Sequence, residues 1–173
     1  MTILEVTIAI AILISGVVGY LQAMVQLERA QQRTREVGRA TQAARQIVES
    51  IRAEAFAEAF RRYNDETNDD PGGIGTAPGK HFDVPGLSAR QGDPDGLPGE
   101  VVFPTPVGQP AFLSEAVVDA RLGMPRDLNG DGVINPLVNY NMEYTILPVL
   151  VRVEWVSSCG PGSVEVKTML GNF

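Results

Sequence analysis

The chain has 173 residues and a formal net charge of −7, and 44% of its residues are hydrophobic. That length suits one domain with a real core. The charge is uneven, because residues 28–62 hold eight Arg and five Glu, whereas residues 63–173 hold six Lys or Arg and fifteen Asp or Glu. The acidic C-terminal part lacks the clustered cations that neutralise phosphates, so we expect no nucleic-acid binding. The single cysteine, Cys159, excludes an intrachain disulfide.

Residues 1–27 form an almost continuous apolar segment, in which the one charged side chain is Glu5. As a helix, residues 6–23 would be about 27 Å long, close to the hydrocarbon thickness of about 30 Å. The segment lacks the basic start and the small-residue cleavage site of a secretory signal, so we expect it to be retained. A carboxylate at membrane depth costs about 2.5–3.5 kcal/mol and normally has a partner. A simple signal anchor with a chance glutamate is the alternative interpretation.

The amine of Met1 offers Glu5 a partner. A free N-terminal amine is a cation at neutral pH, and Met1 lies four residues before Glu5. The amine of one chain can therefore neutralise Glu5 of a neighbouring chain, which predicts an assembly site made of Met1 and Glu5.

The residues Met-Thr-Ile-Leu-Glu-Val, followed by a run of Ile, Ala, Leu and Val, resemble the mature N-terminus of type IV pilins and type II secretion pseudopilins. The resemblance implies that a prepilin peptidase cuts before Met1 and that Met1 is N-methylated. It also implies insertion in the inner membrane before assembly, and then a helical homo-oligomer, a filament on the bacterial surface, built by dedicated assembly machinery. Many family members have a helix-kinking proline near position 22, where this chain has Gln22.

Two glycines take the place of that proline as helix-weakening residues. Gly16 and Gly19 lie within the apolar segment, and each costs about 0.8–1 kcal/mol relative to Ala in a helix interior. We expect any local unwinding of the helix at these two positions.

From Glu28 to about Tyr63 the sequence is charged, rich in Ala and free of Pro. Apolar or small residues recur at helical spacing and predict one buried stripe. They are Val37, Ala40, Ala44, Ile47, Val48, Ile51, Ala55 and Ala59. We therefore predict that one helix continues from residues 1–27, the part for the membrane or the filament core, through an amphipathic second half at residues 28–63.

Residues 64–173 are predicted to form a head made of a turn-rich loop and an antiparallel sheet. Pro-Gly steps crowd residues 65–99 and exclude a long regular element; an ordered loop is expected, and a disordered linker is the alternative. Alternating or apolar runs predict strands, with Pro148 at a bulge or an edge and the last two strands joined as a hairpin. These runs are residues 81–84, 101–103, 112–118, 144–155 and 164–170.

One candidate calcium site stands out between the predicted strands. Oxygen side chains alternate along residues 127–135 around a Gly at the sixth position, as in the first half of an EF-hand or dockerin loop. The predicted ligands are Asp127, Asn129, Asp131, Val133 through its carbonyl, and Asn135. Val138 replaces the usual acid at position twelve and Pro136 blocks the following helix, so Asn139, Asn141, Glu143 or water would supply the missing ligand. An Asx-turn-rich surface loop without an ion is the alternative.

Sequence signals for catalysis are weak. His81 is the only histidine, and a Cys159–His81 pair would need two predicted turn regions to meet.

We predict an α+β fold of the type IV pilin kind, a long helix packed on a small antiparallel sheet, and a non-enzymatic filament subunit. The alternatives are a minor pseudopilin of a type II secretion system and a membrane-anchored, monomeric calcium-binding or adhesive module.

Overall fold

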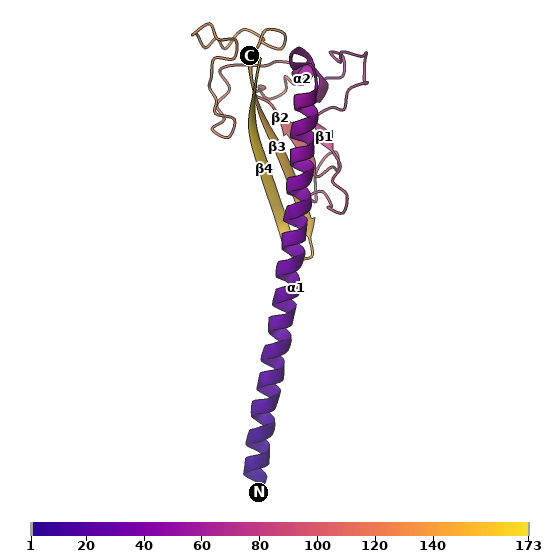
Figure 1. Ribbon diagram of the computed structural model, residues 1–173, viewed down its shortest axis with the longest axis vertical. Coiled ribbons are helices and arrows are strands. Elements are labelled where there is room, and N and C mark those ends of the chain that lie inside the picture. The colour runs from indigo at the N-terminus through magenta and orange to yellow at the C-terminus, as the bar shows by residue number, and fades with distance from the viewer. Residues whose placement is uncertain (1, 173) are drawn as a thin grey trace. The chain divides into compact units, whose positions relative to one another are not determined.

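The computed structural model describes residues 2–172. It contains two helices, α1 (Ile3–Ala53) and α2 (Phe56–Tyr63), and four strands, β1 (His81–Phe82), β2 (Gly99–Val102), β3 (Ile146–Ser157) and β4 (Gly160–Gly171) (Figure 1). All strand pairs are antiparallel. The predicted α+β layout of a long helix and a small antiparallel sheet is therefore confirmed. The chain divides into two compact units, Met1–Glu36 and Val37–Phe173, which are described separately below.

The described part of the first unit is helical from Ile3 onward. The helix passes through Gly16 and Gly19 without interruption, so the expected unwinding is not seen. Two separated glycines cost only about 2 kcal/mol together, and the residues around them, mostly Ile, Leu, Val and Ala, keep the backbone hydrogen bonds in register. Beyond the adjoining residues and the backbone of the same helix, no atom lies within 4 Å of a Cβ added at either glycine.

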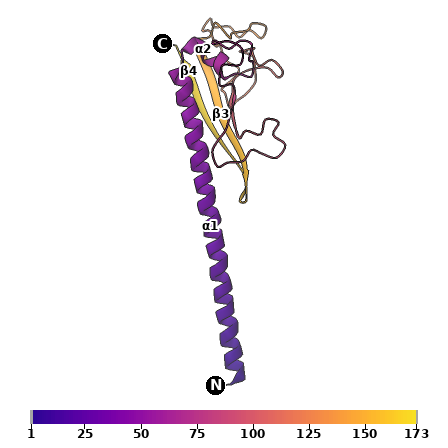
Figure 2. The same cartoon turned by 90° about the vertical axis from the view of Figure 1, so that its right-hand side faces the viewer.

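The sheet of the second unit has the order β1-β2-β3-β4. The predicted C-terminal hairpin is confirmed, since β3 and β4 pair without a break from Ile146–Gly171 to Ser157–Gly160 (Figure 2). Pro148 causes no bulge. It lies at an edge, because β2 pairs only with Leu150 to Val153 and leaves the first part of β3 with one neighbour. Trp155 is opposite Gly162, where a Cβ would overlap the indole ring.

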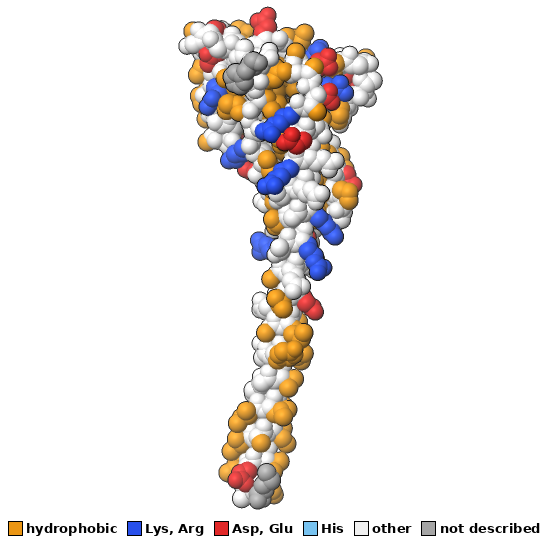
Figure 3. Space-filling model, viewed as in Figure 1, with side chains coloured by type: hydrophobic (Ala, Val, Ile, Leu, Met, Phe, Trp, Pro, Cys, Tyr) orange, Lys and Arg blue, Asp and Glu red, His pale blue; other side chains and the backbone are white. Residues whose placement is uncertain are grey.

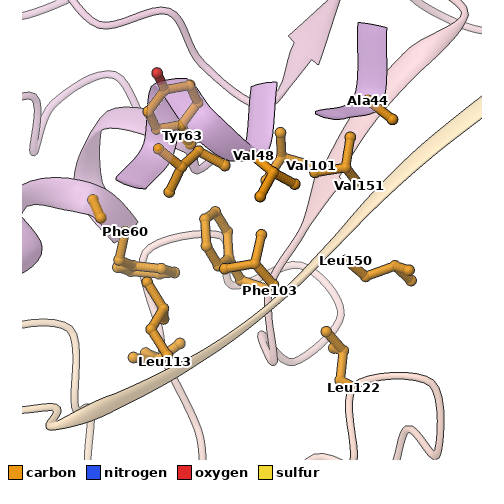
Figure 4. Close-up of a cluster of buried hydrophobic side chains, with 14 of the residues drawn as sticks. Ala44, Val48, Phe60, Tyr63, Val101, Phe103, Leu113, Leu122, Leu150 and Val151 are labelled. Carbon is orange, nitrogen blue, oxygen red and sulfur yellow. The ribbon is translucent and has the colours of Figure 1, made fainter. Parts of the chain in front are cut away.

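The core of the second unit lies between the later part of α1 and the sheet. Four residues of the predicted stripe are buried in α1, at 4% exposure or less, and a fifth is buried in α2: Ala40, Ala44, Val48, Ile51 and Ala59. Figure 4 shows Ala44 and Val48 near Val101 of β2 and Val151 of β3. Val37 and Ala55 are exposed, so the stripe begins one residue of the series later than predicted and is interrupted before Ala59.

The single helix predicted to reach residue 63 is interrupted at residues 54–55. The hydroxyl of Tyr144 donates a hydrogen bond to the Phe56 carbonyl at 2.5 Å and accepts one from the Phe60 N–H at 3.3 Å. Both backbone groups belong to the first turn of α2, so the Tyr144 side chain holds this turn in place just after the break. The change of direction buries Phe60 completely, in an edge-on contact with Phe103. The sequence could not show this because Tyr144 is 84 residues away from Phe60.

Long connections complete the second unit. Residues 64–80 and 83–98 are turns, as predicted, and β1 is shorter than the run at residues 81–84 suggested. Backbone hydrogen bonds such as Gly75 N–H to the Thr67 carbonyl close these turns. The strand predicted at residues 112–118 is wrong. The backbone of that segment bonds to scattered groups, the Ser114 N–H to the Pro104 carbonyl and the Arg126 N–H to the Glu115 carbonyl, and pairs with no strand. Its buried Glu115 side chain accepts backbone N–H groups of another loop.

Candidate functional site

The first turn of α1 holds Glu5 in a capping box. Thr2 lies just before the helix; its backbone N–H donates to Glu5 Oε2 at 2.9 Å, and the Glu5 N–H donates to Thr2 Oγ1 at 3.4 Å. The pair satisfies two of the N–H groups that a helix start leaves without partners, and the carboxylate favours the positive end of the helix dipole. The pattern Thr-x-x-Glu in the sequence was a signal for this cap that the sequence analysis did not use.

The predicted partner of Glu5 lies outside the described residues. Met1 is not among residues 2–172, and a contact between neighbouring chains is not tested by a single chain. The pairing of Glu5 with an amine of another chain therefore stays a prediction. Within the chain, Glu5 uses one oxygen, Oε2, for the bond to Thr2.

The apolar segment after Glu5 exposes its side chains on all sides of the helix. Among the large ones, exposure runs from 44% for Val6 to 68% for Ile12, and hydrophobic side chains cover this segment in Figure 3. An 18-residue window reaches a mean hydropathy of 2.2, so by length and composition α1 is able to cross a membrane. So much exposed apolar surface requires a lipid or protein cover.

The two aliphatic hydroxyl groups in this segment are bonded to their own helix. Thr7 Oγ1 donates to the Leu4 carbonyl at 2.9 Å, and Ser15 Oγ donates to the Ala11 carbonyl at 2.8 Å. Hydroxyls bonded to their own helix need no water, so they carry little cost in an apolar surrounding. Glu5 is the one ionisable side chain of residues 2–27 besides the phenol of Tyr20.

The loop at residues 127–135 is a succession of Asx turns. Asp127 accepts hydrogen bonds from the N–H groups of Gly130 at 2.6 Å and Gly132 at 2.7 Å. Asn129 Oδ1 accepts from the Asp131 N–H, and Asp131 Oδ1 accepts from the Val133 N–H. Gly130 and Gly132 both have φ of +83°, a left-handed conformation that favours glycine. The bonds from Gly132 and Gly130 lower the pKa of Asp127, so its carboxyl is ionised at neutral pH.

A buried carboxylate behind this loop was missed by the sequence analysis. Glu115 is fully buried; its Oε1 accepts the Leu128 N–H at 2.7 Å and its Oε2 accepts the Asn135 N–H at 3.0 Å. Burial of Tyr140, together with its hydrogen bond to Glu115, raises the pKa of that phenol to about 12. The acid inside the apolar run at residues 112–118 was the available signal. Glu115 therefore ties both ends of the calcium-like loop to the core.

The structure brings together only part of the predicted cation site. Asp127, Asn129 and Asp131 share the turn. Asn135 is engaged elsewhere, because its Oδ1 accepts the Leu137 N–H and its backbone N–H donates to Glu115 Oε2. Asn139, one candidate for the missing ligand, instead binds the Leu113 N–H and the Ala111 carbonyl. Among residues 2–172 no group of three or more His, Cys, Asp or Glu side chains is placed to hold a metal. A cation here would need carbonyl and water oxygens beside the two carboxylates.

The structure does not bring His81 and Cys159 together as a catalytic pair. It is in β1, where its ring contacts Asp65 and Asp95, while Cys159 is in the turn of the β3–β4 hairpin. The hollow beside His81 measures about 530 Å³ and has charged walls. Those charges pair with one another, as in Lys80 with Asp65 at 3.1 Å and Arg152 with Glu100 at 2.5 Å. Most of these charges are therefore paired within the chain, and carboxylates outnumber the Lys and Arg side chains in the walls.

Comparison with known proteins gives no relative. The chain matches no family model, no curated protein sequence and no solved structure. Its function is therefore argued from its own residues.

Proposed function

We propose that the chain is a structural subunit of a type IV pilin-like extracellular filament. The single observation that carries the proposal is the exposed apolar helix that follows Thr2. It has Glu5 in its first turn and contains no other acid before Glu28. The antiparallel sheet and the buried stripe of α1 supply the compact head that such a subunit needs. The apolar helix would lie in the membrane first and then in the filament core, with little change in its apolar surroundings.

Glu5 would set the register of the assembly. A buried charge that loses its partner costs about 3–5 kcal/mol, so positions that bring Glu5 to the amine of a neighbouring Met1 are favoured over displaced ones. The bond to the Thr2 N–H keeps the carboxylate ordered at the start of the helix until then. A head-to-tail contact that does not close on itself gives an open helical polymer.

Substitution of Glu5 tests the proposal. Glu5→Ala removes the charge and is expected to lose most filaments, measured by negative-stain electron microscopy of sheared surface material. Thr2→Ala is the matched control, because it removes the hydroxyl that accepts the Glu5 N–H and leaves the carboxylate in place. Filaments of normal yield and geometry from Glu5→Ala would contradict the register role. A wild-type chain that forms no polymer would favour the alternative, a membrane-anchored monomeric module.

A minor pseudopilin of a secretion system is the other form of the same proposal. It shares the N-terminal helix and differs in copy number, so counting subunits per filament in the same micrographs by labelling Cys159 separates the two. A major subunit is expected to carry label along the whole filament. Label confined to one end would identify a minor subunit.

Calcium binding at residues 127–135 is a second candidate function, favoured by the ionised Asp127 held at the start of the loop. Saturating Ca²⁺ is expected to raise the melting temperature of the chain, measured in detergent against an EDTA sample. Asp127→Ala should abolish the rise, and Asp83→Ala, which removes an exposed acid outside the loop, should retain it. An unchanged melting temperature in the wild type would reject the site.

A further inference from the structure

Three arginines follow the apolar segment directly. Residues 2–27 contain no Lys or Arg, and then Arg29, Arg33 and Arg35 come within eight residues of Leu27. All three belong to the unbroken helix α1 and to the first compact unit of the chain. In Figure 3, Lys and Arg side chains begin where the hydrophobic side chains of the helix end. We call these three residues the arginine collar.

The collar lies at the depth of lipid headgroups when the apolar segment spans a bilayer. At about 1.5 Å per residue, residues 6–27 are about 33 Å long, which matches a hydrocarbon core of about 30 Å. With Leu27 at the border of that core, Arg29 would lie about 3 Å beyond it, Arg33 about 9 Å and Arg35 about 12 Å. The headgroup layer is about 5–7 Å thick on each side. Side chains on a helix lean toward its N-terminus, so the long arginine side chains extend back toward this layer and reach the lipid phosphates.

The positive charge of the collar is not neutralised within the chain. Arg33 and Arg35 are exposed, and among residues 2–172 neither side chain forms an ion pair or a hydrogen bond. Side chains on a helix meet at spacings of three and four residues, and no acid stands at those spacings from Arg35. Glu36 has that spacing from Arg33, but its Oε1 accepts a hydrogen bond from Gln32 Nε2 at 3.0 Å.

The collar presents its charges on more than one side of α1. Arg29 and Arg33 are four residues apart and share a face, whereas Arg35, two residues further on, lies nearly opposite Arg33 at 3.6 residues per turn. Glu28 shares the face of Arg35 but precedes it by two turns, about 10 Å along the axis, which is too far for an ion pair. A single protein surface meets a helix from one side, whereas lipid headgroups surround it. The arrangement therefore favours lipid headgroups as the partner.

The chemistry of the guanidinium group selects the kind of lipid. This planar group donates two parallel hydrogen bonds to two oxygens of one phosphate. In phosphatidylcholine a quaternary ammonium group neutralises the phosphate, whereas phosphatidylglycerol keeps a net negative charge. Basic clusters beside a membrane span are typical of binding to anionic lipids. Arg29 and Arg33 repel each other on their shared face, and a phosphate between them would remove that repulsion.

We propose that the arginine collar binds the phosphate groups of anionic phospholipids while the apolar segment lies in the bilayer. The inference rests on the membrane stage of the proposed function and adds the class of lipid that the chain selects there. Anionic lipids would hold the helix at one depth, with the end of the apolar segment at the membrane surface. Transfer of the helix from the membrane to a filament then requires the collar to release its phosphates.

Electron spin resonance of spin-labelled lipids tests the inference on the full-length chain. The chain is reconstituted in phosphatidylcholine vesicles with a trace of spin-labelled phosphatidylglycerol or of spin-labelled phosphatidylcholine, and the fraction of label immobilised at the protein is compared. The wild type is expected to immobilise phosphatidylglycerol several-fold more than phosphatidylcholine. Arg33→Gln combined with Arg35→Gln should bring the two lipids close to parity. The matched control, Arg45→Gln combined with Arg90→Gln, removes two exposed arginines outside the collar and should keep the preference.

A second variant separates loss of charge from loss of structure. Arg33→Lys combined with Arg35→Lys keeps both positive charges at the same positions of the helix. It is expected to retain most of the preference for phosphatidylglycerol, and complete loss of the preference in this variant would overturn the role of charge.

The remaining outcomes also decide the inference. Equal immobilisation of the two lipids by the wild type overturns it, and so does a preference that the Gln variant keeps or that the control loses as well. No lipid preference in the wild type, together with loss of filaments in the Gln variant, overturns it and assigns the collar to an acidic surface of a neighbouring copy. Micrographs of the wild type keep the two proposals apart. Filaments without a lipid preference leave the filament proposal standing, whereas a lipid preference without filaments removes the filament and supports the lipid contact.

Discussion

The two parts of α1 share one helix but meet opposite surroundings. In residues 3–27 the apolar residues occupy every face, and none of the window that resembles a membrane span is buried. In residues 37–53 the apolar residues form one stripe, which packs on the sheet and includes Ile51 at 1% exposure. The contrast teaches that the first part needs a cover from outside the chain, whereas the second part finds its cover within the chain.

The largest expected effect separates residues 3–27 from the core of the second unit by their contribution to the free energy of unfolding. Phe60→Ala removes a ring that is fully buried against Phe103 and should cost about 3–5 kcal/mol of the free energy of unfolding. Ile10→Ala removes a side chain that is 52% exposed and should change it by about 0.5 kcal/mol or less. Urea unfolding followed by the fluorescence of Trp155, the only tryptophan, measures both. Equal costs would mean that residues 3–27 contribute to the head's core.

A medium effect is expected at the carboxylate under the calcium-like loop. Glu115→Gln replaces an acceptor of several N–H groups by an amide with one oxygen, and should lower the free energy of unfolding by about 1–3 kcal/mol. Glu143→Gln, at an exposed acid, is the control and should change it by less than about 0.5 kcal/mol. The same urea titration provides the measurement. No loss for Glu115→Gln would contradict its role in holding the calcium-like loop.

The smallest expected effect is the pH dependence of Asp127. Backbone N–H groups, that of Gly132 first, lower its pKa in the folded chain, so the ionised carboxyl stabilises the fold above its unfolded pKa of about 3.9. This contribution is lost as the pH falls through the folded pKa. In EDTA, the melting temperature of Asp127→Asn should therefore lie below that of the wild type at pH 7, and the gap should close toward pH 2. A gap independent of pH would show that the carboxylate's charge is not the cause.

The sequence predicted the buried stripe and the hairpin well, because both depend on neighbours along the chain. The period of 3.6 residues located the buried stripe at Ala40, Ala44 and Val48, and the alternation after Tyr144 located the hairpin. It failed at the break before Phe56 and at residues 112–118. Both depend on a side chain that meets backbone groups brought from elsewhere in the sequence, Tyr144 in one case and Glu115 in the other. No local pattern carries that information.

By itself, the sequence determined the apolar helix, its one acid at Glu5, the α+β class and the Asp- and Asn-rich loop, because composition and period act over a few residues at a time. Only the tertiary structure decided that Glu115 lies buried beneath that loop and that Leu137 points outward while Ile51 is covered. Burial is decided by which distant segments pack together. The same apolar residue type can therefore be core in one place and an interaction surface in another.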